Sequence, residues 1–240
     1  MTPMPASINE TELQRAYYSK TASAYDESHL DEGDAHFFAL WWLSAIIEYT
    51  GAKSVLDVGS GTGRVLRFLA GRHPKLRLLG IEPVAELRDR AYQQGVPRDH
   101  LVAGDALGLA DATDSFDIVC EFGALHHIRD HKQAAGEMAR VASLGVFLSD
   151  ANNFGQGSFS SRCLKQMLHA VGLWPIAKLI KSRGKGYEYS EGDGVYYSYS
   201  IFGSLPVVRV KFPIIHQLNT SPAGANLYRT ASTVAVFARR

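Results

Sequence analysis

The chain has 240 residues, and its 25 basic and 24 acidic side chains leave a net charge of +1 at pH 7. So small a net charge creates no strong field for nucleic acid or an acidic membrane, and neither is predicted as a partner. The two cysteines form no disulfide framework, and the sequence shows neither a leader segment nor an apolar run of about 18 residues. These features exclude a spanning or disulfide-rich protein and predict a cytoplasmic one.

Apolar strand-like runs alternate along the chain with helix-like segments. An apolar stretch at 37–47 is short for a membrane span and predicts a buried helix. After it, the pattern predicts strands at 54–58, 76–81, 100–103, 116–122 and 145–149, helices at 64–70, 85–94 and 132–142, and β-rich runs at 207–212 and 233–238. This order is typical of a doubly wound, mostly parallel α/β sheet of seven strands with helices on both faces.

The most informative motif joins the first strand to its helix. Gly59, Gly61 and Gly63 follow the apolar run at 54–58 and allow a sharp turn that approaches a ligand closely. The first amides of the next helix would then point at that ligand. A dinucleotide-binding fingerprint would need a third glycine at position 64, where the chain has Arg64. This spacing disfavours a pyrophosphate cofactor.

The pattern Asp-x-Gly-x-Gly-x-Gly, which begins at Asp57, resembles class I S-adenosylmethionine-dependent methyltransferases. A carboxylate suits that cofactor, which carries an amino group and a sulfonium, whereas beside a pyrophosphate it would repel. The resemblance implies that the final two strands form an antiparallel edge element and that 51–151 is the cofactor-binding core. It also assigns to the cofactor site Asp57, Gly59, Ser60, Gly61, Gly63, Glu82, Pro83 and Glu121.

Two further acids follow predicted strands, at the edge where an open α/β sheet binds its ligand. Glu82 lies 25 residues after Asp57, where its carboxylate could accept hydrogen bonds from both ribose hydroxyls. The resemblance assigns Asp105 to the adenine amino group and the amide of Ala106 to the ring. The alternative for each is local, since a lone acid at such a position can cap a helix or start a turn.

His126 and His127 follow the strand at 116–122, at the mouth of the predicted site. An imidazole with a pKa near 6.5 suits proton removal from an acceptor hydroxyl, so either histidine is a candidate general base. The alternative is that one ring packs and braces the loop. No metal is predicted, because adjacent histidines without nearby cysteine or carboxylate ligands do not specify a coordination site.

The N-terminal segment at 1–50 is predicted as a helical lid and docking segment. Its run at 17–26 is similar to the segment that covers the cofactor in many small-molecule methyltransferases, which makes Tyr18 and Tyr25 candidate cofactor contacts. An aromatic lid excludes water from the reaction. A docking helix whose tyrosines cover the core is the alternative.

The long insertion at 152–204 is predicted to be a substrate cap, and 205–240 to complete the sheet. Its first part is basic, and its second part supplies candidate contacts to the acceptor at Tyr187, Tyr189, Tyr196 and Tyr197. The alternative is a solvated helix followed by a tyrosine-rich strand.

The sequence therefore predicts S-adenosylmethionine-dependent methylation of a small molecule, with oxygen favoured as the acceptor atom and a histidine as base. The Asn/Asp-Pro-Pro-Tyr/Phe segment of many nucleic-acid amino-methyltransferases is missing after the strand at 116–122, which disfavours that subgroup. The alternatives are an NAD-dependent oxidoreductase and an S-adenosylmethionine-binding protein without turnover. Neither the acceptor nor the oligomeric state is predicted.

Overall fold

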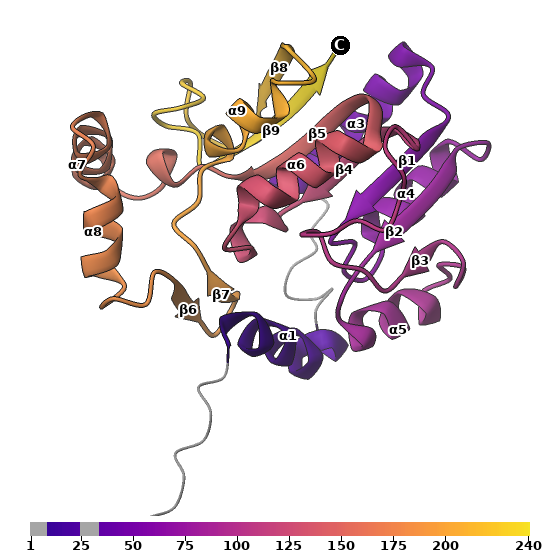
Figure 1. Ribbon diagram of the computed structural model, residues 1–240, viewed down its shortest axis with the longest axis horizontal. Coiled ribbons are helices and arrows are strands. Elements are labelled where there is room, and N and C mark those ends of the chain that lie inside the picture. The colour runs from indigo at the N-terminus through magenta and orange to yellow at the C-terminus, as the bar shows by residue number, and fades with distance from the viewer. Residues whose placement is uncertain (1–8, 25–33) are drawn as a thin grey trace, which may run out of the picture.

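A computed structural model describes residues 9–24 and 34–240 of the chain (Figure 1). Its helices are α1 (Glu10–Thr21), α3 (Ala35–Thr50), α4 (Arg64–Arg72), α5 (Ala85–Gln93), α6 (His131–Val141), α7 (Phe159–Ala170), α8 (Trp174–Lys181) and α9 (Leu205–Val208). Its strands are β1 (Ser54–Val58), β2 (Arg77–Ile81), β3 (Leu101–Val102), β4 (Phe116–Phe122), β5 (Ala142–Ala151), β6 (Glu188–Ser190), β7 (Gly194–Tyr196), β8 (Ile214–Asn219) and β9 (Thr233–Arg239). Short 3₁₀ turns include η1 (Ala22–Ala24) and η2 (Leu125–His127).

Seven strands form one sheet in the order β3-β2-β1-β4-β5-β9-β8. The strands from β3 to β5 are parallel, and β9 pairs antiparallel with both β5 and β8. This confirms the predicted doubly wound sheet and its antiparallel C-terminal edge. The two short strands β6 and β7 form a separate hairpin.

The alternation of side chains along each central strand divides the core into two layers. On β1, Leu56 and Val58 pack with residues of α6 and α9, whereas Val55 packs with residues of α3 and α4. The central strands are buried on both faces, as their continuous apolar runs predict. The sheet is therefore rigid where its C-terminal edge carries functional side chains.

One predicted strand is wrong. Residues 207–212 continue from α9 instead of forming a strand, and β8 begins two residues later, at Ile214. Pro206 stands in the first turn of α9, where proline is tolerated, and the amide of Phe212 donates to the carbonyl of Val208 at 3.0 Å. The side chains of Val208 and Phe212 are fully buried. The apolar pattern at this position therefore belongs to a helical turn.

We predict that Phe147→Ala lowers the free energy of unfolding by about 3–5 kcal/mol, because Phe147 is fully buried and packs against Trp42 and Phe122. Urea denaturation measures the change. The matched control, Phe159→Ala, removes a side chain that is 76% exposed and should change stability by less than about 0.5 kcal/mol. Equal effects of the two substitutions would contradict the assignment of the core.

Candidate active site

The glycine turn lies between β1 and α4 at the C-terminal edge of the sheet. Gly59, Gly61 and Gly63 all have positive φ angles, of 77°, 55° and 76°. A Cβ at Gly59 would lie 2.6 Å from the Cβ of Ala124, so only glycine fits this approach. Ser60 is buried, and its hydroxyl donates to the carbonyl of Asp57 at 3.0 Å. The turn thus forms a backbone cradle with no side chain in the way.

Glu82 follows β2 and fixes the glycine turn from the neighbouring strand. Its Oε2 accepts from the amide of Gly61 at 3.0 Å, and its Oε1 accepts from the amide of Val84 at 2.9 Å. Each oxygen of a carboxylate keeps a second lone pair, which leaves acceptor capacity for two ligand hydroxyls. Burial raises the pKa of Glu82, and the two amides oppose that rise. Pro83 lies beside it in the wall of the cavity.

Asp57 is a buried acid with incomplete compensation. Its Oδ1 accepts from the thiol of Cys120 at 3.7 Å, whereas its Oδ2 has no hydrogen-bond partner among the described residues. Burial raises the pKa of this carboxyl to about 7. A buried anion with an orphaned oxygen beside a glycine cradle is suited to a ligand that carries positive charge.

A cavity of about 370 Å³ extends from the glycine turn to α1. Gly59, Gly61 and Glu82 line one end, and Tyr18 and His127 line the other. α1 contacts α5 on one side and β7 on the other (Figure 1), and its residues Gln14, Arg15 and Tyr18 line the cavity. The volume lies in the range of small-molecule sites. The predicted cofactor-binding residues and the pair of Tyr18 and His127 therefore line one continuous space.

Asp105 and Ala106 also line the cavity, next to β3. The Oδ1 of Asp105 accepts from the amide of Leu107 at 2.9 Å, and its Oδ2 forms an ion pair at 2.7 Å with Arg15 of α1. Both partners are about half exposed, so this pair contributes little to stability. It does connect α1 to the end of the cavity that the sequence assigns to the adenine.

His126 is held as a cation beneath the site. Its Nδ1 lies 2.7 Å from Oδ1 of the buried Asp150, and its Nε2 lies 3.5 Å from Oδ2 of Asp193. Burial alone would lower the pKa of His126, but the two carboxylates outweigh burial and raise the pKa to about 10. A histidine that is protonated at neutral pH cannot accept a proton, so His126 is unsuited to the role of general base.

His127 has the opposite environment. Burial lowers its pKa, and the positive charge of His126, whose ring centroid is 3.9 Å away, lowers it further. Its Nδ1 lies 2.6 Å from the carbonyl of Val195, which favours the tautomer that donates there. The Nε2 is then a free acceptor, and the hydroxyl of Tyr18 lies 2.9 Å from it. The pair of Tyr18 and His127 therefore presents a neutral base to the cavity.

Asp193, in the turn between β6 and β7, joins the two histidines. Its Oδ1 is 3.4 Å from Nε2 of His127. Burial would raise its pKa, but the hydrogen bond from the His126 imidazolium holds the pKa well below the usual range. One ligand atom each from His126, His127 and Asp193 lies within 4.8 Å of the others, a spacing that could hold a metal ion. His126 already pairs with Asp150 and Asp193, and Nε2 of His127 lies beside the hydroxyl of Tyr18. The three groups therefore have partners without a metal ion.

The remaining predicted site residues have structural positions. Glu121 is fully buried and accepts from the amides of Ala124 and Ser149, which fixes the turn after β4. Gly63 packs against Val96 beneath the cradle. Tyr25 lies outside the described residues. Within the described ranges, the cavity wall does not include the four predicted acceptor contacts, Tyr187, Tyr189, Tyr196 and Tyr197.

The tyrosine-rich segment instead supports α1 and η2. The amide of Tyr197 donates to the carbonyl of His126 at 2.8 Å, and the ring of Tyr189 packs edge-on against Tyr17 of α1. Sequence reasoning missed Gln14, Arg15 and Asp193, which hold the cavity mouth. Their sequence positions give no motif, because they meet only when α1 and the β6–β7 hairpin fold onto the sheet.

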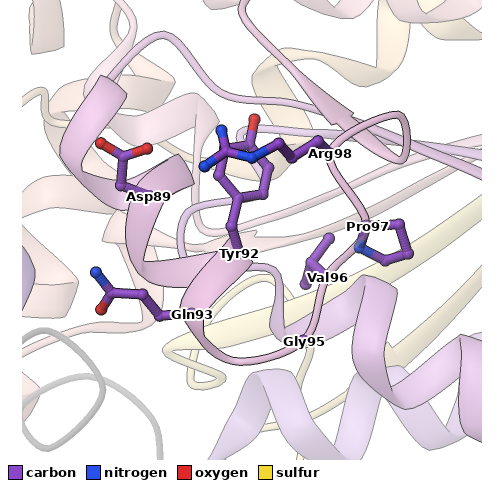
Figure 2. Close-up of a pocket in the computed structure, with 7 residues that line it drawn as sticks. All are labelled: Asp89, Tyr92, Gln93, Gly95, Val96, Pro97 and Arg98. Carbon is purple, nitrogen blue, oxygen red and sulfur yellow. The ribbon is translucent and has the colours of Figure 1, made fainter.

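A second hollow lies at the end of α5 and contains none of the predicted site residues (Figure 2). Its walls come from Asp89, Tyr92 and Gln93 and from the turn that follows, and the guanidinium of Arg98 lies 4.4 Å from the ring centre of Tyr92. Its lining residues include one carboxylate, that of Asp89, but no histidine and no residue of the glycine turn. We therefore assign the chemistry to the cavity under α1.

Comparison with known proteins agrees with this site. Residues 56–149 match the family described as methyltransferase domain. A demethylmenaquinone methyltransferase of Roseiflexus castenholzii is 27% identical over 197 residues, which cover 72% of this chain and 78% of that protein. Several other curated methyltransferases match over less than two thirds of their own length.

Solved structures show the same fold. An S-adenosylmethionine-dependent methyltransferase of Mesorhizobium loti has a TM-score of 0.55 at 19% identity, over 84% of this chain and 98% of that one. A phosphoethanolamine N-methyltransferase of Haemonchus contortus, solved with S-adenosylhomocysteine, has a TM-score of 0.60 at 14% identity, over 99% and 61%. The matched domain and the curated relatives support a class I S-adenosylmethionine-dependent methyltransferase, and the solved structures share its fold. The methyltransferase class also displaces the NAD-dependent alternative.

We predict that Glu82→Ala weakens the binding of S-adenosylhomocysteine at least about tenfold, because the variant loses the acceptors for the ribose and the fixed glycine turn. Isothermal titration calorimetry measures the affinity. Glu48→Ala, on the exposed side of α3, is the matched control and should bind as the wild type does. Unchanged affinity in Glu82→Ala would refute the ribose assignment.

A second prediction concerns the cost of burying Asp57. Because its folded pKa is about 7 and its ordinary value is 3.8, the ligand-free protein loses stability as the pH rises through this interval. Asp57→Asn lacks that loss, so its stability advantage over the wild type should grow between pH 4.5 and pH 8, by on the order of 2–4 kcal/mol. Urea unfolding at both pH values measures it. A stability difference between Asp57→Asn and the wild type that does not change with pH would show that the pKa of Asp57 is not raised.

Proposed function

We propose that this methyltransferase methylates an oxygen atom of a small molecule and that neutral His127, acting through Tyr18, receives the proton of the acceptor. The observation that carries the proposal is the separation of the two histidines by charge. His126 is held as a cation by Asp150, and His127 stays neutral with its Nε2 directed to the hydroxyl of Tyr18. Paired groups whose pKa values are driven apart are typical of acid and base sites.

The residues of the cavity fit the cofactor of the family. The cradle that only glycine can form and the two acceptor oxygens of Glu82 suit a ribose. Asp57, which precedes the glycine turn and is not part of the cavity wall, keeps an orphaned oxygen that suits a positive charge nearby. When bound, S-adenosylmethionine supplies an electrophilic methyl group on a sulfonium and a neutral thioether as leaving group. The protein then has to align the acceptor and exclude water, and alignment contributes on the order of 7–11 kcal/mol.

A hydroxyl acceptor needs more than alignment, because its oxygen becomes a much better nucleophile as its proton leaves. Tyr18 can accept this proton on its oxygen while its own proton moves to Nε2 of His127, over the 2.9 Å hydrogen bond. The imidazolium formed at His127 is then stabilised by Asp193, 3.4 Å away. Within the described part of the cavity wall, Tyr18 and His127 form the pair that offers a neutral base. An amine acceptor, which often arrives with a free lone pair, would depend less on this relay.

α1 supplies the exclusion of water. Its Gln14 and Arg15 bridge to the β6–β7 hairpin and to Asp105, and Tyr18 enters the cavity from the same helix. The same helix therefore supplies Tyr18 to the proton relay and covers the region proposed for the cofactor.

We predict that Tyr18→Phe and His127→Asn each lower kcat by about 10²–10⁴-fold and leave the affinity for S-adenosylhomocysteine within about threefold. Methyl transfer from labelled S-adenosylmethionine is measured on paired acceptors that differ only in a hydroxyl or an amine. Because the pKa of His127 lies below its ordinary 6.5, kcat for a hydroxyl acceptor should fall only below that pH. His100→Asn, remote from the cavity, is the control. Undiminished hydroxyl methylation in His127→Asn would refute the relay, and cofactor binding without turnover on any acceptor would favour the non-catalytic alternative.

A further inference from the structure

α7 and α8 form a helical hairpin that stands at the edge of the molecule, apart from the main sheet (Figure 1). Neither helix contains a buried residue. Both helices nevertheless carry many large apolar side chains, and most of these are exposed, which is unusual for a helix in a globular domain.

The orientation of α7 is inverted relative to that of an ordinary amphipathic helix. At about 3.6 residues per turn, Phe159, Met167 and Val171 lie on one side of the helix, and they are 76%, 57% and 62% exposed. The polar side faces the protein, because Lys165 donates to the carbonyl of Gln156 and Gln166 donates to that of Phe154. The apolar side therefore faces outward and is the side without a partner among the described residues.

α8 continues the same surface. Ile176, Leu179 and Ile180 lie on its exposed side, whereas Trp174 turns inward to the ring of Phe154, with centroids 5.8 Å apart. We call the exposed apolar side chains of both helices the outer face, which includes Phe159, Leu164, Met167, Val171, Ile176 and Ile180.

The segment that contains α7 and α8 carries charges of one sign, and the next acid along the chain, Glu188, pairs with Lys181 at 2.8 Å. Residues 152–187 contain no aspartate or glutamate, and they contain six basic residues, Arg162, Lys165, Lys178, Lys181, Arg183 and Lys185. Since the whole chain carries +1, the six positive charges of this segment leave −5 for the rest. An apolar stripe flanked by lysine and arginine is typical of a helix that lies in the interface of an anionic membrane.

We propose that the outer face of α7 and α8 docks onto the surface of an anionic lipid bilayer. The apolar side chains enter the boundary between headgroups and acyl chains, and Arg183 and Lys185 contact the headgroups. The acidic remainder of the chain is repelled by the same surface, which orients the protein with the hairpin toward the membrane. Among the described residues no helix is long and apolar enough to cross a membrane, so the contact is peripheral.

The charge distribution favours a membrane over a second copy of the chain. A symmetric dimer through the outer face would bring two segments of six positive charges together, and like charges at an interface oppose association. An anionic bilayer instead satisfies both features, since it offers negative charge and an apolar layer at the same depth. The proposal amends the expectation of no membrane partner, which rested on the net charge of the whole chain.

The test is sedimentation of the full chain with vesicles of phosphatidylcholine alone or mixed with phosphatidylglycerol. We expect binding to the anionic vesicles that weakens with salt. The double variant Phe159→Ser/Ile180→Ser should bind at least about tenfold more weakly, since it loses two apolar anchors. Arg183→Gln/Lys185→Gln should lose about tenfold on anionic vesicles and keep any residual binding to neutral ones.

The matched control is Tyr49→Ser/Val210→Ser, which removes exposed apolar side chains outside the outer face and should bind vesicles as the wild type does. Circular dichroism and S-adenosylhomocysteine binding show that each variant is folded. Failure of the wild type to bind anionic vesicles overturns the proposal, and so does equal binding by the Phe159→Ser/Ile180→Ser variant. A dimer in light scattering that this variant makes monomeric would assign the outer face to a second copy instead.

Discussion

The site depends on the compensation of four buried carboxylates that adjacent strands bring to one edge of the sheet. Asp57, Glu82, Glu121 and Asp150 belong to or directly follow β1, β2, β4 and β5, and all are almost completely buried. A buried carboxylate is costly unless hydrogen bonds or opposite charges replace its water. Backbone amides do this for Glu82 and Glu121, and an imidazolium does it for Asp150. Asp57 alone of the four keeps an oxygen that no described residue satisfies, and it lies beside the glycine cradle.

These compensations also fix the geometry of the cavity. The amides of Gly61 and Ala124, in the turns after β1 and β4, donate to Glu82 and Glu121. The same hydrogen bonds therefore compensate the buried carboxylates and hold the two turns in place. Asp150 stabilises the cation at His126, and that cation in turn keeps His127 neutral. Burial lowers the pKa of His127 most, and Asp150 at the end of β5 adds to that effect because it stabilises the cation at His126.

The fold and the cofactor region were predictable from the sequence because their signals are local. Apolar runs specify β1 to β5, and the glycine spacing after Asp57 specifies the turn and its place at the sheet edge. The strand at 207–212 was wrong because Val208 and Phe212 fit a helical turn equally well, and Pro206 decided for the helix. The mouth of the cavity was not predictable, because Gln14 and Asp193 are 179 residues apart and meet only in the folded chain. Four tyrosines of the segment after α8 suggested acceptor contacts, but the ring of Tyr189 packs against α1 and the amide of Tyr197 bonds to η2.

The contacts that attach α1 to the rest of the protein are mostly weak ones. α1 lines the cavity, and in the proposed role of a lid it would open for the cofactor to enter, which requires contacts that are specific but weak. Two of its residues, Gln14 and Tyr17, are buried, and its other contacts are mostly polar and partly exposed, such as the ion pair of Arg15 with Asp105. Such contacts orient α1 on the protein but cost little free energy to break, since exposed ion pairs are worth at most about 1 kcal/mol. The β6–β7 hairpin, which contacts α1 through β7, is the next element after α8 in the chain. One short hairpin therefore joins the helices proposed to contact a membrane to the helix that lines the cavity.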